Sequence, residues 1–189
     1  SYIPMKGKKK VYPYYIGRRN NMTIVNEAIS GTILALDKTY VEDPEHVDIN
    51  TRSPFSYRRY LNSHLANADY ITLWFGTNDS SNTNLGSIDD TTNETFYGAW
   101  NVVLEYLIRQ NPTAKIGLIV SYLWIRDTYK QAVREIGKKW GISVLDLPGD
   151  KNVPAMFDRD SEFEYSGIAK SIRQAVFSVT QENGHPNAA

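Results

Sequence analysis

An apolar run ends in a polar turn at residues 71–79, where the chain carries its first side chains suited to chemistry. The run reads ITLWFGTND and brings Gly76, Asn78 and Asp79 to its carboxyl end. The amide of Asn78 could donate a hydrogen bond to an oxyanion that develops during a reaction, and one such donor is worth roughly 3 to 4 kcal/mol. The same residues could equally form an Asn-Asp turn that closes a strand.

A second polar turn follows residues 22–26 and contains Ser30 and Gly31. Glycine lets the backbone approach a substrate closely, so the N–H of Gly31 could be a second oxyanion donor. A simple strand-to-helix turn is the commoner use of such a pair. The functional interpretation therefore depends on Gly31 sharing one edge of the fold with Asn78.

The third set lies near the carboxyl terminus, where residues 182–187 read ENGHPN. A carboxylate three residues before a histidine can hold the Nδ1–H of the imidazole while Nε2 faces a nucleophile. Glu182 and His185 are therefore a candidate acid and general base. The alternative is an unstructured polar tail, the usual state of residues so near a terminus.

The elements that must position these residues alternate between strands and helices. Short runs rich in Ile, Val, Leu and aromatic residues predict strands at residues 22–26, 70–75, 115–120 and 142–146. These runs are mostly apolar on both faces, which is typical of a buried parallel sheet with helices on each side. The predicted fold class is α/β, in three α/β/α layers.

Helical patterns lie between and after these strands. Apolar residues recur every four positions after Pro54, which predicts a crossover helix that includes Leu61 and Leu65. Further helices are predicted over residues 94–110, from an Asp127 cap to Gly141, and over residues 161–179.

The three polar blocks, in this order and spacing, resemble the SGNH hydrolase family, also called GDSL-like lipases or esterases, over residues 12–187. The resemblance implies a flavodoxin-like parallel sheet. It also implies that Gly31 and Asn78 complete an oxyanion hole, with Glu182 and His185 as catalytic acid and base. It requires no cofactor and no metal, and the sequence shows no His, Asp and Glu cluster with metal-ligand spacing.

Two features depart from the family's pattern. The acid of the family is usually Asp, whereas Glu182 is one methylene longer. The Gly-Asp-Ser block of the family should precede Tyr12, so the nucleophile is either Ser1 or a serine upstream of this chain, and we expect the upstream serine. Residues 1–189 are accordingly expected to form one SGNH hydrolase-like domain, with its first strand and last helix outside the sequence.

The resemblance implies acyl transfer, in which a serine attacks an ester and water releases the acid. The polar residues 80–93 follow a predicted strand and favour a small-molecule or glycan ester as substrate, and hence a short-chain or carbohydrate O-acetyl esterase. Four aromatic residues could line the same rim or equally belong to the core: Tyr122, Trp124, Phe157 and Tyr165.

Two alternatives belong to other classes. An SGNH-like domain without activity could be a binding or adhesion module of a bacterial or phage surface protein, and an extracellular, cell-surface or virion-associated location is favoured over a cytoplasmic one. The residues encoded just before Ser1 would separate this alternative from the enzyme. A flavodoxin-like nucleotide binder ranks third, because no Gly-rich phosphate loop follows any predicted strand.

Composition excludes several other classes. Lys plus Arg and Asp plus Glu number 21 each, so no overall positive field favours nucleic acid. No run reaches the ~18 apolar residues that a membrane span needs. The absence of cysteine excludes disulfides and thiol nucleophiles. His46 and His64 are expected to lie in a loop and on a helix surface.

Overall fold

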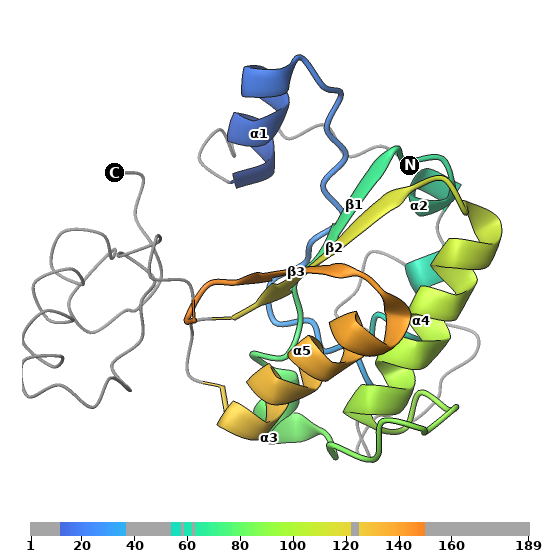
Figure 1. The fold of residues 1–189 in the computed structure, drawn as a ribbon, viewed down its shortest axis with the longest axis vertical. Helices are drawn as coiled ribbons and strands as arrows, with labels where there is room; N and C mark the ends of the chain where they lie inside the picture. Colours follow the sequence, from blue (N-terminus) through green and yellow to red (C-terminus); the bar gives the residue numbers. More distant parts are fainter. Residues whose placement is uncertain (1–11, 37–53, 58, 62, 122–124, 150–189) are drawn as a thin grey trace, which may run out of the picture.

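The computed structural model of the chain describes residues 12–36, 54–57, 59–61, 63–121 and 125–149. A small sheet with helices packed against it forms the body of this part (Figure 1). The predicted helix over residues 161–179 and the candidate residues Glu182 and His185 lie outside the described residues.

Three parallel strands form the sheet. They are β1 (Tyr70–Leu73), β2 (Lys115–Val120) and β3 (Ser143–Asp146), in the spatial order β1-β2-β3. In register, Leu73 lies opposite Leu118, which lies opposite Val144. Each strand falls within a predicted one, so the predicted α/β class with a parallel sheet is confirmed.

Helices lie on both sides of this sheet (Figure 1). The two long helices, α4 (Phe96–Gln110) and α5 (Asp127–Trp140), follow β1 and β2 and cover one face. Helix α1 (Tyr12–Asn20) lies on the other side, where the Tyr12 hydroxyl is 3.0 Å from Thr72 Oγ1. These layers confirm the predicted α/β/α arrangement. None of the helices within the described ranges is long and apolar enough to cross a bilayer.

The predicted apolar stripe of α4 forms the centre of the core. Trp100, Val103, Leu104 and Leu107 are completely buried, as their spacing of three and four residues requires for one helix face. The helix begins at the predicted place because Thr95 Oγ1 accepts the N–H of Gly98 and so caps the first turn. This stripe shares one buried core with Ile71 and Leu73 of β1, the strand that leads to the site.

The predicted strand at residues 22–26 was wrong. A strand requires ladder hydrogen bonds to a neighbour, and among the described residues β1 pairs with β2 alone. Residues 22–26 form no ladder, and the N–H of Met22 donates instead to the carbonyl of Gly17 at the end of α1. The apolar side chains of this segment are also not all buried, since Val25 is 45% exposed.

The predicted helix from Pro54 is interrupted. The N–H groups of Phe55 and Ser56 donate to the carbonyls of residues 33 and 34, which draws this part of the chain onto another segment. Among the described residues that follow, two short helical pieces precede β1, η1 (Arg59–Leu61) and α2 (Ser63–Ala66). The four-residue spacing of apolar side chains therefore predicted helical turns correctly, but the prediction of one continuous helix was wrong.

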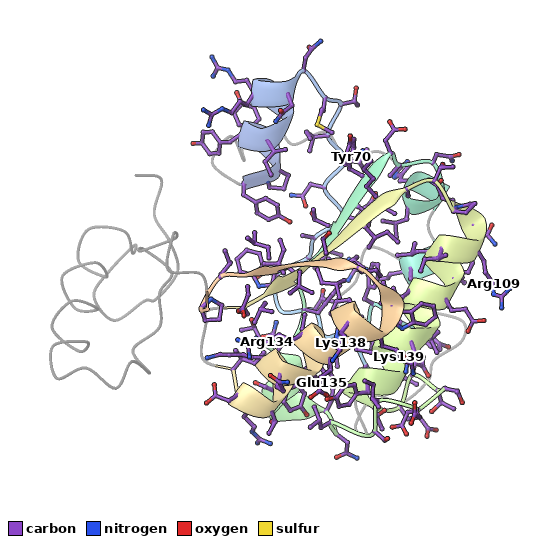
Figure 2. All side chains as sticks on the ribbon, viewed as in Figure 1. Tyr70, Arg109, Arg134, Glu135, Lys138 and Lys139 are labelled. Carbon is purple, nitrogen blue, oxygen red and sulfur yellow. The ribbon has the colours of Figure 1, made fainter. Side chains whose placement is uncertain are left out.

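Two smaller expectations are also corrected. Arg126 is the N-cap of α5, and Asp127 is its first helical residue, paired with Lys130 at 3.2 Å. The sheet was expected to be apolar and buried on both faces, but burial alternates along β1. Leu73 is buried, whereas Tyr70, at the start of the strand, is 55% exposed (Figure 2).

An ion pair fixes the carboxyl end of β3 to α5. Arg134 lies on α5 and is labelled in Figure 2. Its guanidinium donates two hydrogen bonds to the carboxylate of Asp146, at 2.8 and 3.1 Å. Paired bonds of this kind restrict both distance and orientation. The strand end is thereby held at one position relative to the helix.

Candidate functional site

Asn78 lies in the turn that follows β1, at the N-cap position of the short helix α3 (Asp79–Asn82). Its side chain does not cap this helix. The Nδ2 group instead donates a hydrogen bond of 3.2 Å to the carbonyl of Thr32, 46 residues earlier in the chain. The side chain of Asn78 is thus directed across to a second segment, which a purely local Asn-Asp turn would not require.

Gly31 lies on that second segment, next to Thr32. Its φ angle is +82°, in the left-handed region that glycine adopts without steric cost. The carbonyl of Thr32 accepts the hydrogen bond from the Asn78 amide, and Gly31 is the residue directly before Thr32. The structure therefore brings together the two segments that carry the candidate oxyanion donors.

A buried carboxylate joins the same two segments. Asp79 is completely buried, and its Oδ1 accepts the N–H groups of Leu34 at 2.8 Å and Ala35 at 3.0 Å. Its Oδ2 accepts the N–H of Gly76 at 3.2 Å. Burial raises the pKa of Asp79 from 3.8 to about 6, and the hydrogen bonds from these backbone amides oppose that rise.

Asp79 should therefore make stability depend on pH. Because its folded pKa lies above its unfolded pKa, the stabilisation that it contributes is present below pH 3.8 and is lost as the pH rises through about 6. Between about pH 4 and about pH 7.5 the parent should lose roughly 2 to 3 kcal/mol relative to Asp79→Asn. Urea unfolding of both proteins at the two pH values measures this difference, and an equal stability gap at both would contradict it.

A buried guanidinium holds the Gly31 segment from a different side. Arg59 is 5% exposed; its Nη1 donates to Thr32 Oγ1 at 3.0 Å and its Nη2 to the carbonyl of Glu27 at 2.8 Å. Burial lowers the pKa of Arg59, and the charge of Glu27 opposes this effect. The Glu27 carboxylate also contacts His64 Nδ1 at 2.7 Å. His64 is half-buried and paired with Glu27, whereas the sequence led us to expect it on a helix surface.

The ends of β1 and β2 meet through two hydroxyl groups. Thr77 Oγ1 lies 3.0 Å from Ser121 Oγ, directly after β2, and Ser121 is buried. Carboxyl ends of parallel strands lie at one edge of a sheet, which is where open α/β folds bind ligands. Gly76, Thr77 and Asn78 are thus held at the edge where a substrate would be expected.

Gly76 shows why this turn needs its particular residues. Its φ angle is +115°, and a Cβ there would lie 2.7 Å from Ile125 Cδ1 and 3.3 Å from a ring carbon of Phe96. A side chain at this position would therefore displace core atoms next to the site. The glycine lets β1 pass close to the core and still deliver Asn78 to the sheet edge.

The polar residues 80–93, predicted to be a rim, are fastened to the helices. The side chain of Asn101 donates to the carbonyls of Ile88 and Asp90, at 2.9 and 2.8 Å. The hydroxyl of Tyr129 donates to the carbonyl of Thr83 at 2.5 Å. This loop consequently has a defined conformation, and it begins with α3 directly after Asn78.

Other predicted residues lie outside the described part of the chain. They are Glu182, His185, and the aromatic residues Tyr122, Trp124, Phe157 and Tyr165. Within the described ranges, no group of three or more His, Cys, Asp or Glu side chains could hold a metal ion.

Two residues of the site were not singled out from the sequence. Asp79 was noted only as part of the turn after Asn78, although a carboxylate beside a glycine-containing turn commonly binds backbone N–H groups. Arg59 lay in a predicted helix, and nothing in its spacing indicated that it would bind the segment before Gly31.

Solved structures of low sequence identity share this fold. A protein from Lactobacillus plantarum matches with a TM-score of 0.61 and 21% identity, over 92% of this chain and 78% of its own. A "putative GDSL-like lipase" from Bacteroides uniformis matches with a TM-score of 0.60 and 18% identity, over 89% of this chain and 75% of its own. One of the same description from Bacteroides ovatus matches with a TM-score of 0.60 and 17% identity, over 93% and 81%.

At the level of sequence, no protein-family model and no curated protein matches the chain. The structural matches nevertheless establish that the chain has an SGNH/GDSL-like fold. The predicted fold is confirmed, and the identities of 17 to 21% speak to the fold alone.

Proposed function

We propose that the protein is a serine-dependent carboxylic ester hydrolase that transfers an acyl group to water. One observation carries this proposal: within an SGNH/GDSL-like fold, the Asn78 amide at the end of β1 is hydrogen-bonded to Thr32, the residue after Gly31. Two hydrogen-bond donors on adjacent segments are the arrangement that can stabilise the oxyanion of a tetrahedral intermediate.

The chemistry of the amide fits this role. An Asn side chain has two N–H bonds. The bond to Thr32 orients the group, and the second N–H can point to a substrate oxygen. Because this donor is positioned before the substrate arrives, little reorganisation is needed when negative charge develops.

In the proposed reaction a serine attacks the ester carbonyl, and His185 accepts the serine proton. Glu182 orients the imidazole through its Nδ1–H. The Gly31 N–H, the Asn78 amide and the N–H of the serine then bind the oxyanion. The protonated imidazole returns the proton to the leaving alcohol, after which water attacks the acyl-enzyme by the same route and releases the acid. No step requires a metal or an organic cofactor.

The proposed substrate is an ester of a small acid, and a carbohydrate that carries an O-acetyl group is the favoured example. The Ser-, Asn- and Thr-rich residues 80–93 support this, because they follow directly from the candidate site and offer hydroxyl and amide groups to a hydroxylated substrate. The loop is also held in one conformation by α4 and α5, which suits a binding surface more than a passive linker.

The full-length protein should hydrolyse p-nitrophenyl acetate, with a kcat/KM at least about tenfold above that for the decanoate ester. A fluorophosphonate should label one serine, which mass spectrometry of the peptides would locate and so distinguish Ser1 from any other nucleophile. A protein that hydrolysed neither ester and took up no label would not be an esterase. That result would favour an SGNH-like binding or adhesion module instead.

A further inference from the structure

The buried carboxylate of Asp79 is a group at this site to which the proposed reaction assigns no role. It is one peptide bond from Asn78, and it accepts N–H groups three and four residues beyond Gly31. We infer that Asp79 is a positioning residue that sets the separation of the two oxyanion donors, the Gly31 N–H and the Asn78 amide. This inference rests on the proposed function and adds a residue to its machinery.

The hydrogen bonds show how one side chain can set this separation. Oδ1 of Asp79 binds two consecutive amides, those of Leu34 and Ala35, so the segment is fixed in direction as well as in distance. Oδ2 binds Gly76 in the turn that carries Asn78. A single rigid carboxylate therefore connects both donor-bearing segments.

The other contacts of the Gly31 segment do not replace this connection. The carbonyls of Ile33 and Leu34 accept the N–H groups of Phe55 and Ser56, and Arg59 binds Thr32 Oγ1. Those partners belong to residues 54–59, which do not carry Asn78. The Asn78 Nδ2 group also joins the two donor segments, through its hydrogen bond of 3.2 Å to the carbonyl of Thr32.

A role beyond fold stability is consistent with the energetic cost of this group. Burial makes the ionised carboxylate of Asp79 less favourable than it would be in water, as its raised pKa indicates, and the hydrogen bonds that oppose this effect come from neutral backbone amides. Locally unfavourable groups concentrate at functional sites, where geometry matters more than stability. A displacement of about 1 Å at such a site can reduce turnover by about 100-fold.

Two substitutions of Asp79 weaken the connection between the two donor segments to different degrees. Asp79→Asn keeps a carbonyl oxygen for Leu34 and Ala35 but places an NH2 group opposite the Gly76 N–H, so kcat should fall about 3- to 10-fold. Asp79→Ala removes all three hydrogen bonds, so kcat should fall about 30- to 100-fold. In both variants KM should stay within about twofold of the parent, because the substrate itself does not contact Asp79.

A transition-state analogue separates positioning from folding. The affinity of an acetyl-mimicking trifluoromethyl ketone, which forms the oxyanion on the enzyme, should fall in parallel with kcat/KM. Rates are referred to the concentration of serine titrated by fluorophosphonate, so that unfolded protein does not count. Glu135→Ala is the matched control, because the Glu135 carboxylate also joins two elements, accepting the hydroxyl of Tyr97 on α4 and the side-chain amide of Gln131 on α5, but not the Gly31 segment. It should retain the parent kcat.

The outcomes distinguish the inference from the proposed function. If the parent is active and Asp79→Asn has the parent kcat and analogue affinity, the inference is overturned and the hydrolase proposal stands. The same conclusion follows if Glu135→Ala loses as much activity as the Asp79 variants. If Asp79→Ala does not fold, Asp79→Asn alone decides. A parent protein that hydrolyses no ester overturns the proposed function, and the inference with it.

Discussion

Replacing His185 with alanine should lower kcat for p-nitrophenyl acetate by about 10⁴- to 10⁶-fold, with a much smaller change in KM. The proposed nucleophile is an alcohol that is largely protonated near neutral pH, so it needs a base at the moment of attack. The imidazole also supplies the proton that the leaving alcohol takes. Loss of one side chain therefore disables both halves of the reaction, and steady-state kinetics on titrated enzyme measures the effect.

A histidine from outside the predicted motifs provides the matched control. His46→Ala removes the same side chain and should leave kcat within about twofold of the parent, because no role in acid–base catalysis is proposed for it. Retention of parent activity by His185→Ala would show that another group is the base. Equal losses in both variants would indicate a general sensitivity to histidine removal rather than catalysis by His185.

The parts of the fold that the sequence predicts well are those whose pattern follows from burial. The strands β1, β2 and β3 are short apolar runs, and each pairs with a neighbour inside the described region. The stripe on α4 has the spacing of one helix face, and Trp100, Val103 and Leu104 are all completely buried. Local composition and tertiary packing agree in these elements, so one predicts the other.

The predictions that failed depended on a partner that local pattern does not specify. Residues 22–26 have the composition of a strand, but a strand exists only where another strand supplies ladder hydrogen bonds. The helix expected after Pro54 is interrupted because Phe55 and Ser56 donate to residues 33 and 34, far away in sequence. Both errors are cases in which tertiary contacts override local preference.

At the candidate site, sequence reasoning singled out the two proposed oxyanion donors but not the residues that hold their segments in place. Gly31 and Asn78 were singled out because a glycine turn and an amide at a strand end are suited to oxyanion binding. Arg59 and Asp79 act on the same segments through buried hydrogen bonds that join residues far apart in the chain. Such contacts depend on three-dimensional proximity, which residue type and spacing do not encode.

Replacing Asn78 with alanine should reduce kcat about 100- to 1000-fold, the usual cost of removing one oxyanion donor. The change removes the N–H proposed to bind the oxyanion and also the hydrogen bond to Thr32. Asn78→Asp separates a lost donor from a lost side chain, because it keeps the shape of Asn but has no N–H and adds negative charge where an anion should form. It should therefore be at least as impaired as the alanine variant.

The exposed residue Asn20 gives the matched amide control, since its Nδ2 also donates to a backbone carbonyl, that of Ile16 at 2.8 Å, but lies at the end of α1. Asn20→Ala should keep the parent kcat and the parent affinity for the trifluoromethyl ketone. If Asn78→Ala and Asn78→Asp also kept both, the amide could not be the oxyanion donor. The hydrogen bond to Thr32 would then serve only to fasten the turn after β1 to the Gly31 segment. An acyl-transfer site at this edge would have to obtain its oxyanion stabilisation from backbone N–H groups alone.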